Sequence, residues 1–226
     1  MATVADVAPT RIVVESAAPV ADPAPLGLAA FALTTFVLSG HNATFIPDLI
    51  WVGPALVYGG LVQFAAGMWE FRNRNVFGAT AFSTYGGFWM SLGIFVTLAV
   101  VSKTFGAALA GANLPNAVAW FLLAFAIFNT YMLLWSTQVS VAVFLVFLTL
   151  EATEILLVIG NFDAAHGHAN NGWTHLGGWV GIATAAVAWY ASAAGVINGM
   201  KAPAAVLPVG APLHVHRRPM PRRQHA

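Results

Sequence analysis

Long uninterrupted runs of apolar residues fill most of the chain between residues 26 and 196, and short polar or proline-containing segments separate them. A helix needs about 20 apolar residues to cross a hydrocarbon core of about 30 Å. Membrane barrels are built from strands that alternate in polarity over about ten residues, so these continuous runs favour helices. The pattern predicts an all-α membrane protein with six transmembrane helices, at roughly Leu26–Leu38, Ile50–Trp69, Thr80–Val101, Ala117–Thr137, Val139–Ile159 and Trp173–Val196.

The first of these runs is the shortest. It reaches the length of a span only if the helix continues from Ser39 through Asn42. A short or irregular helix is tolerated in a bilayer only where its backbone faces protein or a water-filled cavity. We therefore expect the first span to line a path through the protein rather than to face lipid.

The two ends of the chain differ from this central part. Residues 1–22 are rich in Ala, Val and Pro, and residues 201–226 contain five prolines and four arginines. We expect a mobile N-terminal tail and a basic, proline-rich C-terminal tail on either side of a membrane domain at residues 23–200.

Basic residues close to the spans predict the orientation. With an even number of spans both termini share one side, and that side holds Arg72, Arg74 and Lys201, against Lys103 on the other. Cytoplasmic loops carry the excess of Lys and Arg. Both termini of this multi-pass protein are therefore predicted to lie in the cytoplasm.

Composition supports the same class. Hydrophobic residues make up 59% of the chain and charged residues 8%, whereas soluble proteins carry about a quarter charged residues. The net charge of +1 indicates no nucleic-acid partner, and the absence of cysteine excludes disulfides and thiolate metal sites. Glycines at Gly-xxx-small spacing in several spans allow helices to approach closely in lipid, which favours an oligomer.

Two carboxylates stand out in the fifth predicted span. Glu151 and Glu154 are three residues apart and share a helix face. A carboxylate near the bilayer centre costs about 2.5–3.5 kcal/mol on insertion scales. Each residue is either a protonatable group beside a solute path or a neutral packing residue, because burial favours the uncharged form.

Other polar positions within or beside the spans suggest a narrow, partly polar path. They are Thr34, Thr35, Gln63, Ser83, Thr84, Tyr85, Asn129 and Asn161. The predicted fifth loop also holds Asp163, His166, His168 and His175. Its spacing fits no closed metal site, so we interpret it as a solvated loop and expect no metal or cofactor.

Several motifs resemble one family. DPAPLGL at residues 22–28 is similar to the NPAPLGL signature of the acetate uptake transporter family, the GPR1/FUN34/YaaH group. Later spans supply YGGxxQxxAGxxE from Tyr58, FGxTAFSxYGxFW from Phe77, IGN from Ile159 and HxxGWxG from His175. The motif residues of the first signature are Asp22, Pro23, Pro25, Leu26 and Gly27.

The resemblance implies six helices per protomer, a ring-shaped homohexamer, and passage of acetate, often succinate, through each protomer in a proton-linked or channel-like manner. It implies a constriction of Phe, Tyr and Leu, which falls on Phe31, Tyr85 and Leu150. Candidates for contact with substrate or protons are Thr34, Thr35, Gln63, Glu151, Glu154, Asn161 and His175.

Two departures from the family pattern bear on function. Asp22 replaces the usual Asn, although Asp can also cap a helix. Glu151 and Glu154 stand where members of the family carry uncharged residues. Carboxylates would suit a cation path, so export of ammonia or ammonium is the alternative function. A membrane scaffold without transport activity, and an enzyme, are disfavoured by the short tails and by the lack of a nucleophile–base pair.

Overall fold

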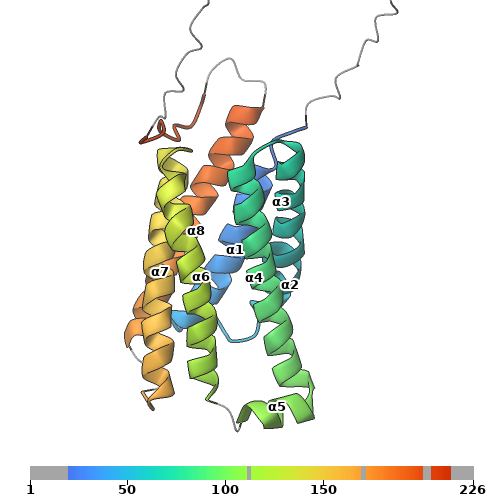
Figure 1. Ribbon diagram of the computed structural model, residues 1–226, viewed down its shortest axis with the longest axis vertical. Coiled ribbons are helices and arrows are strands. Elements are labelled where there is room, and N and C mark those ends of the chain that lie inside the picture. The colour runs from blue at the N-terminus through green and yellow to red at the C-terminus, as the bar shows by residue number, and fades with distance from the viewer. Residues whose placement is uncertain (1–19, 111–112, 169–171, 201–204, 215–226) are drawn as a thin grey trace, which may run out of the picture.

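Five helices of the computed structural model are long and apolar enough to cross a membrane (Figure 1). The structure describes residues 20–110, 113–168, 172–200 and 205–214. These findings confirm the prediction of an all-α membrane protein. The five helices are α1 (Ala24–Asn42), α4 (Val76–Val101), α6 (Leu114–Ser136), α7 (Val141–Ala165) and α8 (Gly172–Gly199).

The predicted second span is divided into three consecutive elements. They are α2 (Val52–Leu56), the π-helix η1 (Val57–Val62) and α3 (Gln63–Arg72). Within η1, a Cβ on Gly59 would lie 2.7 Å from Cβ of Thr34, so glycine is needed for α1 to pack this closely. The first span continues through Asn42 as a regular helix, so α1 reaches the length of a span, and the irregular geometry lies in the neighbouring column.

Helix ends differ from the sequence prediction at two places. The helix α7 extends to Ala165, so Asn161 and Asp163 lie on it rather than in a loop. A short helix, α5 (Lys103–Ala110), occupies a segment that was expected to be a loop. Polar side chains begin three of the long helices as expected for N-caps, since Asn75, Asn113 and Ser140 each accept a hydrogen bond from a main-chain N–H.

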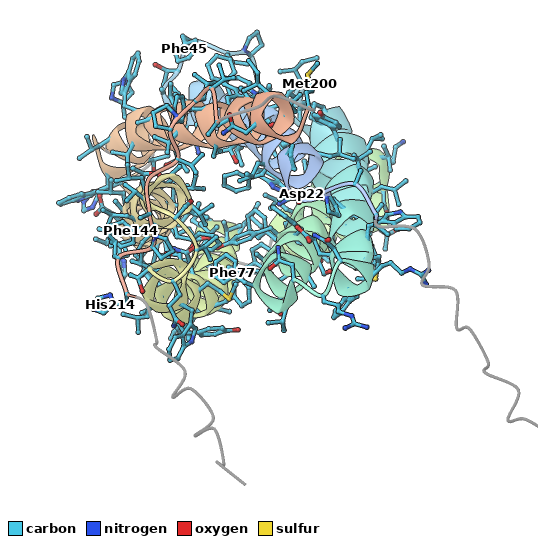
Figure 2. The ribbon with its side chains drawn as sticks, turned by 90° about the horizontal axis from the view of Figure 1, so that it is seen from above. Asp22, Phe45, Phe77, Phe144, Met200 and His214 are labelled. Atoms are coloured by element: carbon cyan, nitrogen blue, oxygen red, sulfur yellow. The ribbon has the colours of Figure 1, made fainter. Side chains whose placement is uncertain are left out.

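The helices surround a common centre (Figures 1 and 2). Neighbours pack in the order α6, α7, α8, α1, the α2–η1–α3 column and α4, and a sparser contact between α4 and α6 closes the ring. Seen from the end of the bundle that carries the termini, Phe77 lies toward the centre, whereas Phe45 and Met200 lie at the periphery (Figure 2). This arrangement gives each helix an inner face and an outer face.

The outer faces carry large apolar side chains, as a protein surrounded by lipid requires. Leu61, Trp120, Ile127 and Leu134 are each about 60% exposed. The described ends of the chain, Val20 and His214, belong to the same end of the bundle (Figure 1). The predicted tails lie partly outside the described residues.

A segment of the predicted C-terminal tail lies against the bundle. Within residues 205–214, the carbonyl of Val209 accepts a hydrogen bond from the N–H of Ala142 at 2.8 Å, and the N–H of Leu213 donates to the carbonyl of Thr137 at 2.7 Å. The hydroxyl of Tyr190 on α8 donates to the carbonyl of Pro208 at 2.7 Å. These contacts join the α6–α7 turn to α8.

Candidate functional site

A cavity of about 260 Å³ lies between the helices, in the half of the bundle away from the termini. Its outer end is marked by His41 and Asn42 at the end of α1, by Trp51, and by Thr174 on α8. Pockets for drug-sized ligands are typically about 300–1,000 Å³. The cavity therefore suits a solute of a few heavy atoms.

The inner end of the cavity is aromatic. Phe31 and Tyr85 meet edge to face with ring centroids 5.8 Å apart, and Leu150 lines the same cavity. Phe128 packs against Tyr85 from the α6 side at 5.5 Å. All three residues of the predicted constriction thus border one cavity. Beyond Tyr85, toward the termini, the ring of Phe77 contacts that of Phe147 at 5.2 Å.

Helical periodicity explains which side chains reach the cavity. Residues three, four or seven apart fall on one side of a helix. The lining residues follow this spacing on three helices: Phe31, Thr35 and Leu38 on α1; Tyr85, Phe88, Trp89 and Leu92 on α4; and Leu150, Glu154, Leu157 and Asn161 on α7.

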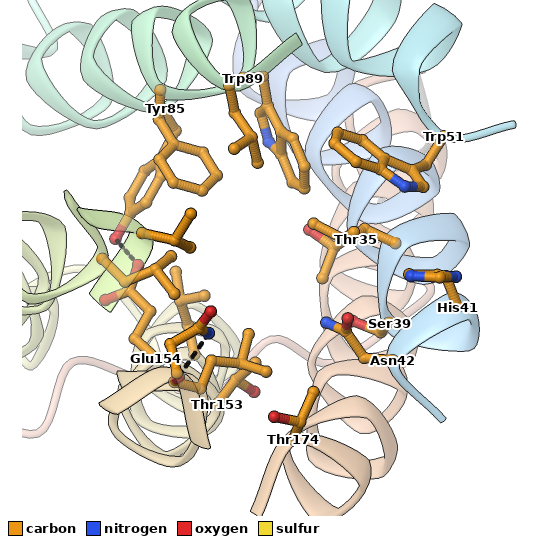
Figure 3. A pocket seen from close by; sticks show the side chains of 18 of the residues that line it. Thr35, Ser39, His41, Asn42, Trp51, Tyr85, Trp89, Thr153, Glu154 and Thr174 are labelled. Carbon is orange, nitrogen blue, oxygen red and sulfur yellow. Dashed lines mark hydrogen bonds between the residues drawn. The ribbon is translucent and has the colours of Figure 1, made fainter. Parts of the chain in front are cut away.

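Three polar atoms on this wall have no hydrogen-bond partner within the described part of the chain: Thr35 Oγ1, Trp89 Nε1 and Glu154 Oε2. All three side chains are buried to 95% or more. In Figure 3 they surround the open space together with Tyr85. A buried polar group without a partner costs about 1–3 kcal/mol, so these atoms indicate a site for a polar ligand or water.

The threonine pair on α1 shows the contrast. The hydroxyl of Thr34 donates to the carbonyl of Ala30 at 3.0 Å, as helix-buried threonines commonly do. Thr35 makes no such bond and lines the cavity, whereas Thr34 faces η1 instead. The structure thus separates two residues that were predicted together.

The two glutamates also separate. Glu154 lines the cavity, and its Oε1 lies 3.4 Å from the Tyr85 hydroxyl. Glu151 is partly exposed on the other side of the α6–α7 contact, where its carboxylate accepts hydrogen bonds from Asn129 at 2.6 Å and Thr130 at 2.7 Å. Only Glu154 of the pair lines the candidate path.

The remaining predicted contact residues are scattered. Asn161 lines the cavity, and its amide donates to the carbonyl of Leu157 at 2.8 Å. Gln63 is buried outside the cavity wall. His175 is exposed on α8 and contacts the ring of Trp179, with centroids 6.3 Å apart.

The DPAPLGL motif holds the start of α1. The Asp22 carboxylate accepts a hydrogen bond from the N–H of Ala24 at 3.0 Å, although the N-cap position itself belongs to Pro23. The carbonyl of Pro25 accepts from the Ser192 hydroxyl at 2.6 Å. A Cβ on Gly27 would lie 2.7 Å from the ring of Phe82. Leu26 is 47% exposed, on the outer face of α1.

Two residues at the site were not singled out from the sequence. Trp89 belongs to a quoted motif, and its i+4 spacing from Tyr85 was the signal that it shares the cavity face. Asn129 was noted only as a buried polar residue, and no sequence spacing links α6 to α4.

The described part of the chain holds no cluster of His, Asp and Glu side chains suited to a metal ion; His168 instead pairs with Asp163 at 2.7 Å.

Comparisons with known proteins identify the family of the chain. Residues 5–211 match the model of the GPR1/FUN34/yaaH family. The chain is 41% identical over 184 residues to "Ammonia transport outward protein 2" of Saccharomyces cerevisiae, covering 78% of this chain and 61% of that protein. It is 33% identical over 193 residues to the succinate-acetate/proton symporter SatP of Escherichia coli K12, covering 84% of this chain and 95% of the symporter.

A solved structure shows the same fold. The structure of the bacterial acetate channel SatP superimposes with a TM-score of 0.75 at 32% sequence identity, covering 84% of this chain and 99% of that one. The chain spans about 61% of the length of the yeast relatives that it matches. From the family match and the shared fold, the chain belongs to the GPR1/FUN34/yaaH family, the SatP-like acetate transporter family.

Proposed function

We propose that this chain is a transporter or channel for acetate and other small monocarboxylates, with succinate as a further substrate. The observation that carries the proposal is the set of three unpartnered polar atoms, on Thr35, Trp89 and Glu154, in a cavity whose wall is mostly apolar. An indole N–H is a donor only, and a hydroxyl can donate. Such a wall offers hydrogen bonds to a carboxylate and apolar contacts to its methyl group.

The size of the cavity and its lack of lysine and arginine support the same function. No Lys or Arg lines it among the described residues. A conducting site must bind its solute weakly enough to release it, and neutral donors satisfy that condition better than a cation would. Phe31, Tyr85 and Leu150 act as the constriction, where apolar side chains select by size and exclude water.

Glu154 makes the path proton-linked in this proposal. An ionised carboxylate about 5 Å from a passing acetate, at an effective dielectric of about 20, would repel it by about 3 kcal/mol. A neutral Glu154 would remove that repulsion and leave the Trp89 indole and the Thr35 hydroxyl to donate to the acetate carboxylate. Transport is therefore expected to need the protonated form of Glu154.

The architecture of the proposed transporter has six spans, with the α2–η1–α3 column as the sixth. Residues 52–72 form an unbroken helical path whose 21 residues match the length needed to cross a bilayer. Both termini lie in the cytoplasm, and six protomers form a ring with one path each, as the family resemblance implies. Mass measurement in mild detergent would test the ring, and a stable monomer would contradict it.

The decisive experiment measures radiolabelled acetate uptake into proteoliposomes under an imposed inward proton gradient. We expect saturable uptake above that of protein-free liposomes, which correct for diffusion of neutral acetic acid. Excess unlabelled succinate tests the wider substrate range by competition. Uptake equal to that of protein-free liposomes at every acetate concentration would contradict the proposal.

Transport of ammonium is the second candidate, favoured by the Glu154 carboxyl that faces the cavity and by the name of a yeast relative. Ammonium would require that carboxylate to be ionised, the opposite of the acetate mechanism. Methylammonium uptake in the same proteoliposomes separates the two functions, because an ammonium path carries methylammonium and leaves acetate outside.

A further inference from the structure

A chain of hydrogen bonds crosses three helices behind the cavity wall. The Tyr85 hydroxyl on α4 lies 2.8 Å from Asn129 Oδ1 on α6 and 3.4 Å from Glu154 Oε1 on α7. Asn129 Nδ2 donates to the carbonyl of Phe147 at 3.1 Å and to the Glu151 carboxylate at 2.6 Å. Asn129 is fully buried, so all its hydrogen bonds are made within the protein.

The partners of Asn129 fix the orientation of its amide. The Phe147 carbonyl can only accept, and the Glu151 carboxyl oxygen lies 2.6 Å from the same Asn129 Nδ2. The NH₂ group must therefore face these two groups, which leaves the amide oxygen facing Tyr85. Glu151 is partly exposed and also faces the Thr130 hydroxyl at 2.7 Å, so it stands in a more polar setting than Glu154.

The orientation of the amide determines the direction of the next bond. A phenol has one proton, and at 2.8 Å the Asn129 oxygen is the better acceptor for it than Glu154 at 3.4 Å. Toward Glu154 the Tyr85 oxygen then presents only a lone pair. An ionised Glu154 would face that lone pair without a proton between them, whereas a protonated Glu154 donates into it.

We propose that Asn129 is a positioning residue that fixes the hydrogen-bond direction of Tyr85, and thereby holds Glu154 in its neutral, donor form, with Glu151 as the anchor of the arrangement. This inference rests on the proposed function only for its consequence for acetate. Within the described part of the chain, the charged or titratable groups that act on Glu154 are Tyr85 from α4 and, from its own helix, Glu151 beyond the α6–α7 contact. His41 of α1 lines the far end of the cavity.

The test is a pair of single substitutions and their combination. Replacing Asn129→Ala frees the Tyr85 proton to turn toward Glu154 and lets that carboxyl ionise. We expect acetate uptake at neutral pH to fall at least about tenfold, and its decline with rising pH to begin at a lower pH than in the parent. The double variant Asn129→Ala/Glu154→Gln should transport as Glu154→Gln alone does, because glutamine cannot ionise.

A merely structural role for Asn129 predicts a different result. The double variant would then be as slow as Asn129→Ala, and the pH profile of the single variant would keep the parent's midpoint; either outcome overturns the inference. Thr130→Ala is the matched control, since it removes the other partner of Glu151 from the same helix and leaves Asn129 in place. Its pH profile should match that of the parent.

A second measurement does not depend on transport. Infrared difference spectra at neutral pH should contain the carbonyl band of a protonated carboxyl, assigned to Glu154 by its loss in Glu154→Gln. The band should be present in the parent and lost in Asn129→Ala. Its absence from the parent, or its persistence in Asn129→Ala, overturns the inference even if acetate is transported. Its loss in Asn129→Ala supports the inference even if the substrate is another solute.

Discussion

The inner and outer faces of α7 hold the same chemical group in opposite settings. Glu154, on the inner face, is 5% exposed and has one oxygen without a partner in the described part of the chain. Glu151, one turn earlier, is partly exposed and has hydrogen bonds to both oxygens. Three residues of helix turn through about 300°. The 60° that separates the two side chains places them on either side of the α6–α7 contact.

The comparison teaches that the neighbouring helix, rather than the spacing on α7, decides what each carboxyl can do. Asn129 of α6 donates a hydrogen bond to Glu151, the outer glutamate. Glu154, the inner glutamate, lines the cavity and has Tyr85 as its neighbour. Substitutions paired across the two faces therefore test whether the inner face alone carries function.

The largest effect is expected from a leucine pair on α7. Leu150→Ala removes a buried side chain from the constriction, which should cost about 2–5 kcal/mol of stability and widen the path enough to admit lactate. Leu148→Ala removes a 42% exposed leucine from the outer face and should change neither property much. Thermal denaturation in detergent and lactate uptake into proteoliposomes measure the two effects. An unchanged size cutoff in Leu150→Ala would remove this residue from the constriction.

A tryptophan pair tests the unpartnered donors. Trp89→Phe removes an N–H that has no partner in the cavity wall, and a hydrogen bond to a charged group is worth about 1.5–3 kcal/mol. The acetate concentration for half-maximal uptake should rise about tenfold to a hundredfold. Trp51→Phe is the matched control, because Trp51 lines the same cavity but its N–H already donates to Asp48 at 3.2 Å. Equal effects of the two substitutions would show that bulk, and not the donor, matters.

Two adjacent glycines on α4 allow the same comparison for helix packing, since Gly86 lies against α3 and Gly87 has open space at its Cβ position. A Cβ on Gly86 would lie 2.7 Å from the backbone nitrogen of Phe64, so Gly86→Ala must push α3 away and should cost about 1–3 kcal/mol. A Cβ on Gly87 meets nothing within 4 Å, and Gly87→Ala should gain up to about 1 kcal/mol from helix propensity. Thermal unfolding of the two variants gives the difference. A loss of stability in Gly87→Ala would instead place that residue at a contact between protomers.

The smallest effect is expected on acetate uptake at low pH when either glutamate is replaced by glutamine. Glu154→Gln mimics the neutral form, so it should retain acetate transport and lose part of the fall in uptake as external pH rises. Glu151→Gln should keep the parent's pH profile, because its amide oxygen can still accept from Asn129. Uptake must be compared at matched concentrations of acetate anion, since neutral acetic acid becomes scarcer at high pH. Identical profiles in parent and Glu154→Gln would leave Glu154 as a packing residue.

The sequence was sufficient to predict the class of fold and most of the helices. Long apolar runs and the motifs fixed their positions to within a few residues, because burial in lipid allows little else. The sequence was not sufficient to predict the π-helix within the second predicted span, because that geometry depends on the close approach of α1 at Gly59. The pattern of apolar residues also did not predict α5, because this helix at Lys103–Ala110 is too short to cross a membrane.

The site was predictable only along single helices. The spacing of Leu150 and Glu154 placed both on the cavity face, and the structure agrees. The role of Asn129 was not predictable, since it arises from the contact of α6 with two other helices. Thr34 and Thr35 are adjacent in sequence and identical in chemistry, and only the packing of η1 against α1 separates them.

The segment at residues 205–214 supplies hydrogen-bond partners to a turn that lies far from it in the sequence. The N–H of Ala142 and the carbonyl of Thr137, at the turn between α6 and α7, find their partners in this segment. The segment follows the turn by about seventy residues, so during synthesis these two groups stay hydrated until residues 205–214 have been made. The hairpin that carries Asn129 and both glutamates is therefore fixed only after α8 has been made, and a chain cut short at Gly199 should keep a hairpin that is freer to shift.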